Sequence, residues 1–441
     1  MEMTEPGGRR RLSSDFWKFW TGQVISQLGT SFTAFAVPLL IYHLTHSAMN
    51  LAITMAAEML PYLLFGLVIG AWVDRLDRKR MMIGVSILQA LVIGSIPAIN
   101  NAGGLSVWWI YGVAFVNQTL FIFFNAGEFA AIPSLVGKDN LVTANGRIQA
   151  SYFATTVLGP LMAGGLSAFI PIPDLLAFDA VSYLVSAGAL ATVRRSFNDR
   201  NVDRLPTTIR RDVVEGLRYV LGHPVLRNIS MMMAAVNFVT ATTAAQLVLF
   251  AKDRFHASNA EIGLLFGVGG CGVVIFSLAA GRLRRRWSFS VVALGSLTMM
   301  GAMTVAFALV PWYWVAIVFW GLESGFGSLF NIQTGSLRQS IVPNHLLGRV
   351  MTIAGVLAWS AIPLGALIGG FAIVRTHNVV LVYTVIGALT VLIPLLFSLT
   401  PLGHAEDYVP KDTVLPDHEA TQAIEATSEG GVGERRSAGT G

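Results

Sequence analysis

Four acidic residues stand inside long apolar stretches of the chain, where an ionised carboxylate is costly. A carboxylate in such surroundings takes up a proton more readily than one in water, so it could carry a proton between two compartments. The candidates for this proton transfer are Glu58, Glu323, Asp179 and Glu128. Glu58 and Glu323 are favoured because each lies well inside its apolar stretch. A fixed polar contact between helices is the alternative role, and for Asp179 it is the favoured one.

A second polar set has the spacing of a single helix face. Side chains three or four positions apart lie on one side of a helix, so they could line a cavity for a small molecule. The candidate cavity residues are Gln23, Ser26, Gln27 and Thr30 in one apolar stretch, and Asn237, Thr240 and Gln246 in another. Hydrogen bonding between helices is an alternative of equal weight for each of them.

The charged run GAWVDRLDRKR, residues 70–80, follows one of the apolar stretches directly. Gly70 permits two helices to approach closely. Asp74, at the end of a helix, could pair with a cation or with the N-terminus of another helix. A solvated loop without a coupling function is the alternative interpretation of this run.

The composition places these residues in a membrane protein. Of the 441 residues, 54% are hydrophobic and 12% are charged, about half the charged share of soluble domains. Apolar stretches of about 18 residues or more can cross a bilayer as helices, whereas a barrel would show short alternating segments. We predict an all-α integral membrane protein with twelve transmembrane helices. The predicted spans are 16–42, 50–73, 80–99, 107–130, 146–170, 174–193, 229–251, 261–281, 289–310, 312–337, 350–374 and 378–400.

The positive charges predict the orientation, because loops kept in the cytoplasm carry an excess of Lys and Arg. Most basic residues precede the first span or follow an even-numbered one, and only Lys252, Arg254 and Arg375 fall on the other side. Both termini are therefore predicted to be cytoplasmic, in a protein of the cytoplasmic membrane. Contact with anionic lipid head groups accounts for the formal net charge of +5. The expected partner is the lipid bilayer, and no nucleic acid is needed.

The two halves of the chain are related. The segment SLVGKDNLVTANGRIQAS followed by GPLMAGG leads into the fifth span, and SIVPNHLLGRVMTIAG followed by PLGALIGG leads into the eleventh. Transporters with such repeats hold their substrate near the bilayer midplane and work by alternating access. The predicted divisions are a cytoplasmic tail at 1–15, a six-helix bundle at 16–193, a cytoplasmic linker at 194–228, a second six-helix bundle at 229–400 and a disordered cytoplasmic tail at 401–441.

The run at 70–80 resembles the signature of the major facilitator superfamily, as Gly70-x-x-x-Asp74-Arg75-x-x-Arg78-Lys79 between spans two and three. The resemblance implies twelve helices in two pseudo-symmetric six-helix bundles. It also implies that Asp74, Arg75 and Arg78 form a gating latch between the bundles on the cytoplasmic side. The corresponding loop of the second half, AAGRLRRRW, lacks the aspartate, so any charge latch there must differ.

Longer stretches resemble the drug/proton antiporter branch, which includes macrolide efflux proteins and the enterobactin exporter. These stretches include FWKFWTGQVISQLGTSFTAFAVPLLIYHLT, FDAVSYLVSA and LRQSIVPNHLLGRVM. Antiporters of the superfamily often carry Gly-Pro-x-x-Gly-Gly on span five, but here Gly159 and Pro160 precede Gly164 and Gly165 by one residue more. The motif therefore does not establish antiport. These four residues still predict a kinked helix with close packing at an interface.

The resulting hypothesis is a secondary transporter that exports hydrophobic or amphipathic small molecules by proton-coupled alternating access. A siderophore exporter is the alternative within transport, and a non-transporting membrane sensor or scaffold is the alternative of another class. Import by the same fold also stays open. No enzyme is expected, because HExxH, GxSxG and phosphate-loop spacings are missing from the sequence. With one cysteine, Cys271, no metal or cofactor is expected either. The resemblance implies a monomer.

Overall fold

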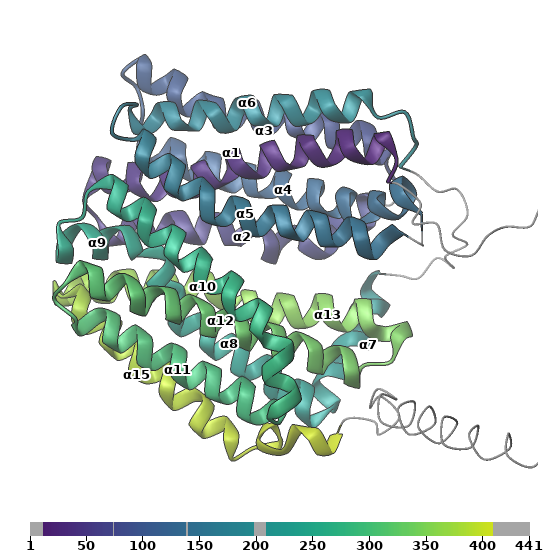
Figure 1. Cartoon of the computed structure of the whole chain (residues 1–441), viewed down its shortest axis with the longest axis vertical. Coiled ribbons are helices and arrows are strands. Elements are labelled where there is room, and N and C mark those ends of the chain that lie inside the picture. Colours follow the sequence, from purple (N-terminus) through teal and green to yellow (C-terminus); the bar gives the residue numbers. More distant parts are fainter. Residues whose placement is uncertain (1–11, 74, 138–139, 198–208, 409–441) are drawn as a thin grey trace, which may run out of the picture.

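The protein is a bundle of helices in two halves. The structure is a computed structural model that describes residues 12–73, 75–137, 140–197 and 209–408, and every regular element within these ranges is a helix. Figure 1 shows the two halves as bundles lying side by side, with most helices running between the same two ends. The N-terminal bundle contains α1 (Ser14–Thr45), α2 (Ala48–Val73), α3 (Arg78–Asn101), α4 (Val107–Val136), α5 (Leu141–Leu166) and α6 (Ile172–Thr192).

The C-terminal bundle repeats this plan with two of its crossings divided. It contains α8 (Pro224–Ala245), α9 (Leu247–Phe255), α10 (Asn259–Arg286), α11 (Phe289–Leu309), α12 (Tyr313–Ile341), α13 (Asn344–Trp359), α14 (Ala361–Thr376), α15 (Val379–Ser398) and the 3-10 helix η2 (Pro401–Tyr408). Helix α7 (Ile209–Gly222) lies in the connection between the bundles and packs against α8 and α13.

The helices account for the twelve predicted spans. Among the described residues, 10 helical segments are long and apolar enough to cross a membrane, and α8 with α9, bent by 50° at their junction, forms an eleventh crossing. The remaining predicted span corresponds to α5, which has 26 residues but is less apolar because it carries polar side chains in its first turns. Because α5 packs against α1 and α10, neighbouring helices cover part of its surface.

Local sequence signals explain where many helices begin and end. Ser13 and Ser106 accept a hydrogen bond from a backbone N–H of the first turn of α1 and α4, as N-cap residues do. Ser258 and Glu261 form a reciprocal capping box at the start of α10. His46 ends α1 in the left-handed conformation, with a φ of 47°. These contacts satisfy backbone groups that the ends of a helix leave without partners.

The eleventh span is interrupted at one residue, Ser360, between α13 and α14. Pro363 has no backbone N–H, so the carbonyl of Trp359 loses its helical donor. The Ser360 hydroxyl donates to the carbonyl of Leu357 at 3.1 Å, and the Asn237 side chain of α8 donates to the carbonyl of Ala358 at 2.9 Å. Two side chains thus donate to carbonyls in the last turn of α13, directly before the interruption.

The structure differs from the predicted tail at 401–441, because its first eight residues form η2. Leu402 and Ala405 are fully buried in the apolar core of the C-terminal bundle. The Glu406 carboxylate accepts hydrogen bonds from the backbone N–H and the hydroxyl of Ser290 at the start of α11. Leu402 and Ala405 are only two apolar residues, which is too few to produce a periodic signal in the sequence. Residues 409–441 of that prediction, and residues 1–11 of the N-terminal tail, lie outside the described residues.

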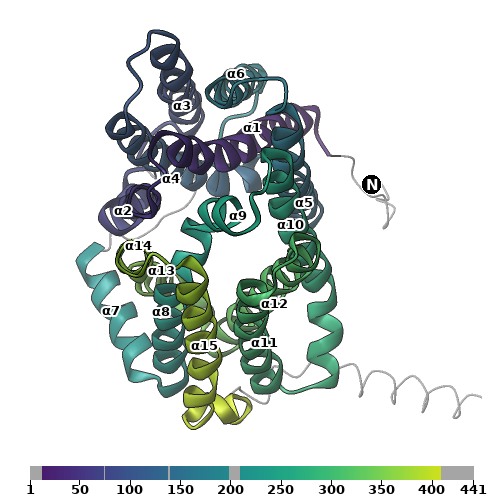
Figure 2. The same ribbon diagram turned by 90° about the vertical axis from the view of Figure 1, so that its left-hand side faces the viewer.

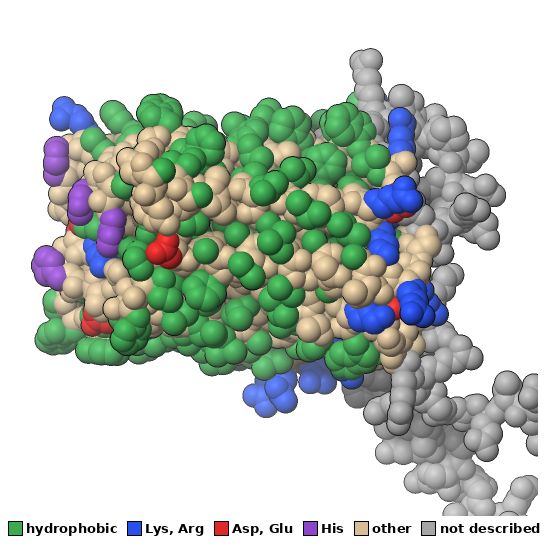
Figure 3. Space-filling view, turned by 90° about the horizontal axis from the view of Figure 1, so that it is seen from above, with side chains coloured by type: hydrophobic (Ala, Val, Ile, Leu, Met, Phe, Trp, Pro, Cys, Tyr) green, Lys and Arg blue, Asp and Glu red, His purple; other side chains and the backbone are tan. Residues whose placement is uncertain are grey.

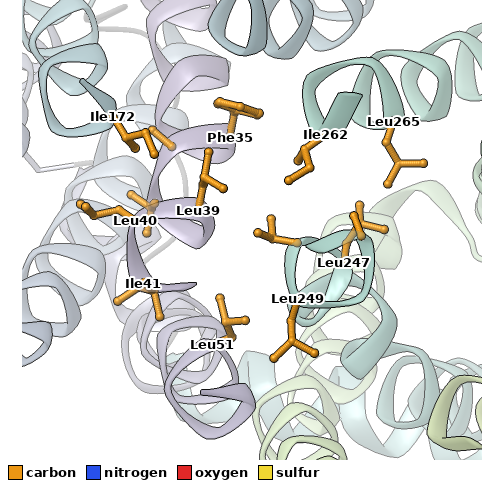
Figure 4. Packing of buried hydrophobic residues seen from close by; sticks show 14 of the residues in the cluster. Phe35, Leu39, Leu40, Ile41, Leu51, Ile172, Leu247, Leu249, Ile262 and Leu265 are labelled. Atoms are coloured by element: carbon orange, nitrogen blue, oxygen red, sulfur yellow. The ribbon is translucent and has the colours of Figure 1, made fainter. Parts of the chain in front are cut away.

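The halves meet along two helix pairs, α5 with α10 and α2 with α14 (Figure 2). At the end that carries α9, buried apolar side chains of α1 and α2 join those of α9 and α10 in one cluster (Figure 4). The backbones touch there, because a Cβ built on Gly164 would lie 2.8 Å from the Gly263 Cα. We call this end, with residues 44–48 and 246–259, the closed end. The opposite end, which carries α7 and η2, is the linker end.

Candidate substrate cavity and buried carboxylates

A cavity of about 350 Å³ lies between the two halves. It is bounded by α2 and α4 of the N-terminal bundle and by α13 of the C-terminal bundle. The described lining residues are Met59, Tyr62, Leu63, Gly66, Ile122, Met351, Thr352, Gly355, Val356, Trp359 and Ser360. No charged side chain is among these lining residues, so the cavity offers mainly apolar and aromatic surface, the kind that binds hydrophobic small molecules.

An aromatic pair joins the halves across this cavity. The rings of Tyr62 on α2 and Trp359 on α13 lie 5.3 Å apart at 68°, an edge-to-face arrangement. Trp359 is the last residue of α13, so the interruption at Ser360 sets its position. Neither residue was a candidate from the sequence. The signals that point to them are the one-turn spacing of Tyr62 from Glu58 and the proline that interrupts the span just after Trp359.

Glu58 lies directly beside the cavity in sequence. It precedes the lining residue Met59 and stands one helical turn before Tyr62, and it is half-buried. Within the described part of the chain, no hydrogen bond or ion pair of its carboxylate is found. A membrane carboxylate with no fixed partner is free to change its protonation state without breaking a structural contact.

Glu323 occupies a different place, inside the C-terminal bundle. It is buried on α12 with 6% of its surface exposed, and its carboxylate accepts a hydrogen bond from the Ser324 hydroxyl at 3.3 Å. The buried Tyr383 of α15 lies close enough to interact electrostatically with it. The structure therefore does not bring Glu323 and Glu58 into one site, and Glu323 does not line the cavity.

Asp179 is held by hydroxyl groups within the N-terminal bundle. Its fully buried carboxylate accepts hydrogen bonds from Thr33 of α1 and from Ser182, the latter at 3.2 Å. Helix α1 passes closely because of Gly29, where an added Cβ would lie 2.7 Å from the Asp179 carboxylate. This is the arrangement of a fixed contact between α1 and α6.

Glu128 stands near the linker end of α4. One oxygen of its carboxylate is buried without a hydrogen-bond partner in the described structure. The adjacent Gly127 packs on Met81 and Met82 of α3. Glu128 is therefore partly buried, and it is not among the residues that line the cavity.

The polar residues considered for the cavity form hydrogen bonds between helices in several cases. Gln23 donates to Ser186 at 3.4 Å, Thr30 and Tyr183 share a hydrogen bond at 3.2 Å, and Asn237 bonds to α13 as described. Thr240 donates to the Val236 carbonyl of its own helix at 2.8 Å, and Gln246 donates to the Ala48 carbonyl at 2.7 Å. Ser26 is buried, and the side-chain oxygen of Gln27 is buried without a hydrogen-bond partner among the described residues. None of these seven residues lines the cavity.

The charged run at 70–80 is only partly described, because Asp74 lies outside the described residues. Gly70 is in the last turn of α2, and Arg75 is exposed. Arg78 donates to the Phe197 carbonyl at 3.2 Å, and Lys79 donates to the Val193 carbonyl at 2.6 Å. Both contacts fasten the start of α3 to the chain that follows α6.

The glycines of α5 face two different neighbours. Gly159 lies against Ser31 of α1, whereas Gly164 lies against Gly263 of α10. The Pro160 carbonyl also lies at this contact, 2.6 Å from a Cβ built on Gly263. In the described part of the chain, nothing lies within 4 Å of a Cβ added to Gly165, so a side chain there would meet open space. Helix α5 runs through Pro160 without a break in its helical residues.

A family model described as a transmembrane secretion effector matches residues 12–432. Macrolide efflux protein A of Streptococcus pyogenes is 25% identical over 80% of this chain and 88% of its own length. The multidrug efflux pump Tap of Mycolicibacterium fortuitum is 26% identical over 78% and 85% of the two chains. The enterobactin exporter EntS of Escherichia coli is 24% identical over 90% and 95%.

Solved transporter structures share the fold. A bacterial homologue of the lysosomal transporter Spinster, in an inward-facing and unoccupied conformation, superposes with a TM-score of 0.69 at 15% identity and covers 93% of this chain and 100% of its own. A bacterial homologue of the iron transporter ferroportin, in an inward-facing state, has a TM-score of 0.65 at 19% identity, with 87% and 98% of the two chains covered.

Proposed function

We propose that this chain, which belongs to the transmembrane secretion effector family of the major facilitator superfamily, exports hydrophobic or amphipathic small molecules. The protein is a multi-pass membrane transporter and not an enzyme. The observation that carries the proposal is the cavity between the halves, because its apolar and aromatic lining suits molecules of low polarity. Relatives named for macrolide and multidrug efflux support export as the direction.

The proposed cycle uses the cavity between the halves as the binding site. Substrate enters at the linker end, the bundles rock about it, and substrate leaves at the closed end. A membrane carboxylate takes up a proton from outside and releases it inside, which resets the protein. Glu58 is the first choice for this role because it stands next to Met59 and one helical turn before Tyr62, which both line the cavity, and because it has no fixed partner in the described structure. Glu323 is the second choice, and Asp179 and Glu128 follow.

We place the linker end in the cytoplasm, with both termini there, and the protein in the cytoplasmic membrane. Figure 3 supports this orientation, because hydrophobic side chains cover the middle of the molecule and Lys and Arg gather at the linker end. Histidines gather at the closed end in the same view. An excess of Lys and Arg marks cytoplasmic loops.

The charged run at 70–80 is proposed to bias the cycle. Asp74, Arg75 and Arg78 would latch the two bundles at the linker end when the closed end opens. The bonds of Arg78 and Lys79 to the chain after α6 support a tightly held loop, since they fix one side of such a latch. We propose that the protein works as a monomer, because each chain contains both halves of the cavity.

A siderophore exporter is the second candidate, and the similarity to the enterobactin exporter favours it. An anionic siderophore would need cationic or hydrogen-bonding groups around it. The described cavity lining contains Thr352 and Ser360 but no Lys or Arg. The lining therefore favours the less polar substrate class.

The test is substrate-dependent proton movement in proteoliposomes that hold the purified full chain. A pH-sensitive dye reports proton flux when lipophilic antibiotics or dyes are added under an imposed gradient. We expect flux that requires substrate and that is lost in Glu58→Gln or, failing that, in Glu323→Gln. Glu261→Gln is the matched control, because Glu261 caps α10 at the closed end, away from the cavity. Substrate counterflow without any proton movement would contradict the coupling, and no substrate movement at all would contradict export.

A further inference from the structure

The closed end is sealed by contacts between the two halves. Among the described residues, two side-chain hydrogen bonds cross between the halves there. Tyr42 of α1 donates to Asp253 of α9 at 2.7 Å, in an exposed position. Gln246 donates from its amide nitrogen to the Ala48 carbonyl at the start of α2, also at 2.7 Å, and it is completely buried.

Gln246 stands at the junction of α8 and α9, where the seventh span bends by 50°. Its backbone N–H still bonds to the Thr242 carbonyl, so α8 ends at this residue. The bend carries Leu247 and Leu249 into the apolar cluster shared with α1 and α2 (Figure 4). Gln246 thus stands at the point where the C-terminal half bends toward the N-terminal half.

Around the bond from Gln246 to Ala48, residues of the two halves are in direct contact. A Cβ built on Gly370 of α14 would lie 2.6 Å from the Ala52 Cβ and 3.1 Å from the Ala48 carbonyl oxygen. The amide nitrogen of Gln246 lies 3.5 Å from the same point. The amide oxygen of Gln246 is buried and has no hydrogen-bond partner in the described structure. The closed end therefore satisfies one polar group of this side chain and leaves the other unsatisfied.

We propose that Gln246 is the positioning residue that holds the closed end shut. Its amide donates to the Ala48 carbonyl only while the halves touch, so the bond favours the state in which the cavity faces the linker end. When the halves part at the closed end, water reaches both groups and also the amide oxygen that is unsatisfied in the closed state. The side chain therefore stabilises one state without preventing the other. This inference rests on the proposed export by alternating access and on the closed end facing outward.

The exposed bond between Tyr42 and Asp253 does not serve the same purpose. Water competes for both groups in either state, so this bond changes the balance between the states little. The apolar cluster also stabilises the closed end, but hydrophobic contacts do not depend on the orientation of the groups that meet. A buried donor with one acceptor depends on the distance between the halves, which makes it sensitive to their separation.

The test measures how often the closed end opens. Cys271 is the single cysteine of the chain and is replaced first, as Cys271→Ser. Leu51→Cys then places a reporter in the sealed cluster, where Leu51 is 2% exposed. A membrane-impermeant maleimide is added outside intact cells that make the full chain. With Gln246 present we expect slow labelling, and with Gln246→Leu we expect labelling about tenfold faster, which corresponds to about 1.4 kcal/mol, near the net worth of one hydrogen bond.

Gln23→Leu is the matched control. Gln23 is another buried glutamine whose amide donates a hydrogen bond, but its acceptor Ser186 belongs to the same half. We expect no faster labelling in Gln23→Leu. Equal acceleration by both substitutions would overturn the proposal, because it would reflect general loosening. Unchanged labelling in a Gln246→Leu protein that is made in normal amounts would overturn it as well.

A second variant tests the donor itself. Gln246→Glu restores a donor to the Ala48 carbonyl only when its carboxyl group is protonated. The reporter itself reacts faster as the pH rises, because the thiolate is its reactive form. We therefore expect the ratio of the labelling rate in Gln246→Glu to the rate with Gln246 to increase as the external pH rises. A ratio that does not change with pH would overturn the role of the hydrogen bond. The labelling needs no transported substrate, so failure of the proposed export would leave this result readable.

Discussion

At the scale of single residues, the cavity depends on two aromatic side chains that matter because they contact each other across the two halves. Tyr62 and Trp359 are ordinary aromatic residues in the sequence, yet their rings meet across the two halves. Aromatic groups of this kind contribute contact area and edge or face interactions to an apolar ligand. A planar or amphipathic substrate between α2 and α13 would meet both rings.

Replacement of Trp359 should weaken substrate binding. We expect Trp359→Ala to raise the Kd for a lipophilic substrate about tenfold, because it removes a large apolar surface from the cavity wall. Binding to the purified full chain can be measured by equilibrium dialysis with a radiolabelled drug. Trp314→Ala is the control, since Trp314 is 65% exposed on α12 and does not line the cavity. An equal loss of affinity in both variants would count against the cavity as the binding site.

At the scale of elements, the short helix η2 closes the linker end of the C-terminal bundle. It contacts α8, α11 and α15, and its Leu402 is completely buried. The Ser290 hydroxyl oxygen lies 2.8 Å from the Leu402 carbonyl oxygen and 3.0 Å from the Glu406 carboxylate, so its single proton can be donated to either of these acceptors. Residues that follow the last span thereby tie three helices together.

This tie should depend on pH. Burial raises the pKa of Glu406, but hydrogen bonds from the backbone and hydroxyl of Ser290 and from the Ser288 side chain outweigh it, so the pKa lies below its usual value. A lowered pKa in the folded state means that the ionised carboxylate stabilises the fold above its unfolded pKa. This contribution is lost as the pH falls through the lowered value.

We therefore expect the Tm of the detergent-solubilised wild type to exceed that of Glu406→Gln near neutral pH. The difference should shrink as the pH falls through the lowered pKa of Glu406, because protonation removes the advantage of the carboxylate. Thermal unfolding of both proteins at a series of pH values measures it. Asp407→Gln, at an exposed neighbour, should behave like the wild type. A difference that persists unchanged at low pH would contradict the assignment.

At the scale of the whole molecule, alternating access requires the halves to approach closely and to separate. The contact between Gly164 and Gly263 sets the limit of this approach, because a side chain on either would meet backbone atoms. A Cβ built on the next residue, Gly165, would meet open space among the described residues. The close approach of α5 and α10 therefore requires a glycine at 164 but not at 165.

Gly164→Val should therefore impair transport where Gly165→Val does not. The added side chain at Gly164 would push α10 away from α5 and weaken closure, and backbone clashes of this kind are not relieved by rotamer changes. Drug efflux from cells that produce each variant in equal amounts measures the effect. We expect at least about a tenfold loss of efflux rate for Gly164→Val, equivalent to about 1.4 kcal/mol. Equal activity of both variants would show that this contact does not limit transport.

The sequence was sufficient to predict the helical membrane fold, because long apolar stretches leave few alternatives in a bilayer. Each of the twelve predicted spans overlaps a helix of the structure, and 10 or 11 of these helices are long and apolar enough to cross a membrane. The cavity could not be located in the same way. Asn237 has the polarity and position expected of a cavity residue, but its side chain donates to the Ala358 carbonyl of α13. Polar side chains in membranes serve substrates and helix contacts alike, and only the neighbouring helix distinguishes the two.

The polar first turns of α5 have a consequence for how the protein is made. A segment of this kind gains less from entering lipid than the other spans do, so the insertion machinery would release it into the bilayer less readily. Helix α1 emerges from the ribosome well before α5 and offers the surface on which α5 packs in the finished protein. Because α1 is made first, the least apolar span has a packing partner when it reaches the membrane. A defect in α1 would slow the entry of α5 into the bilayer.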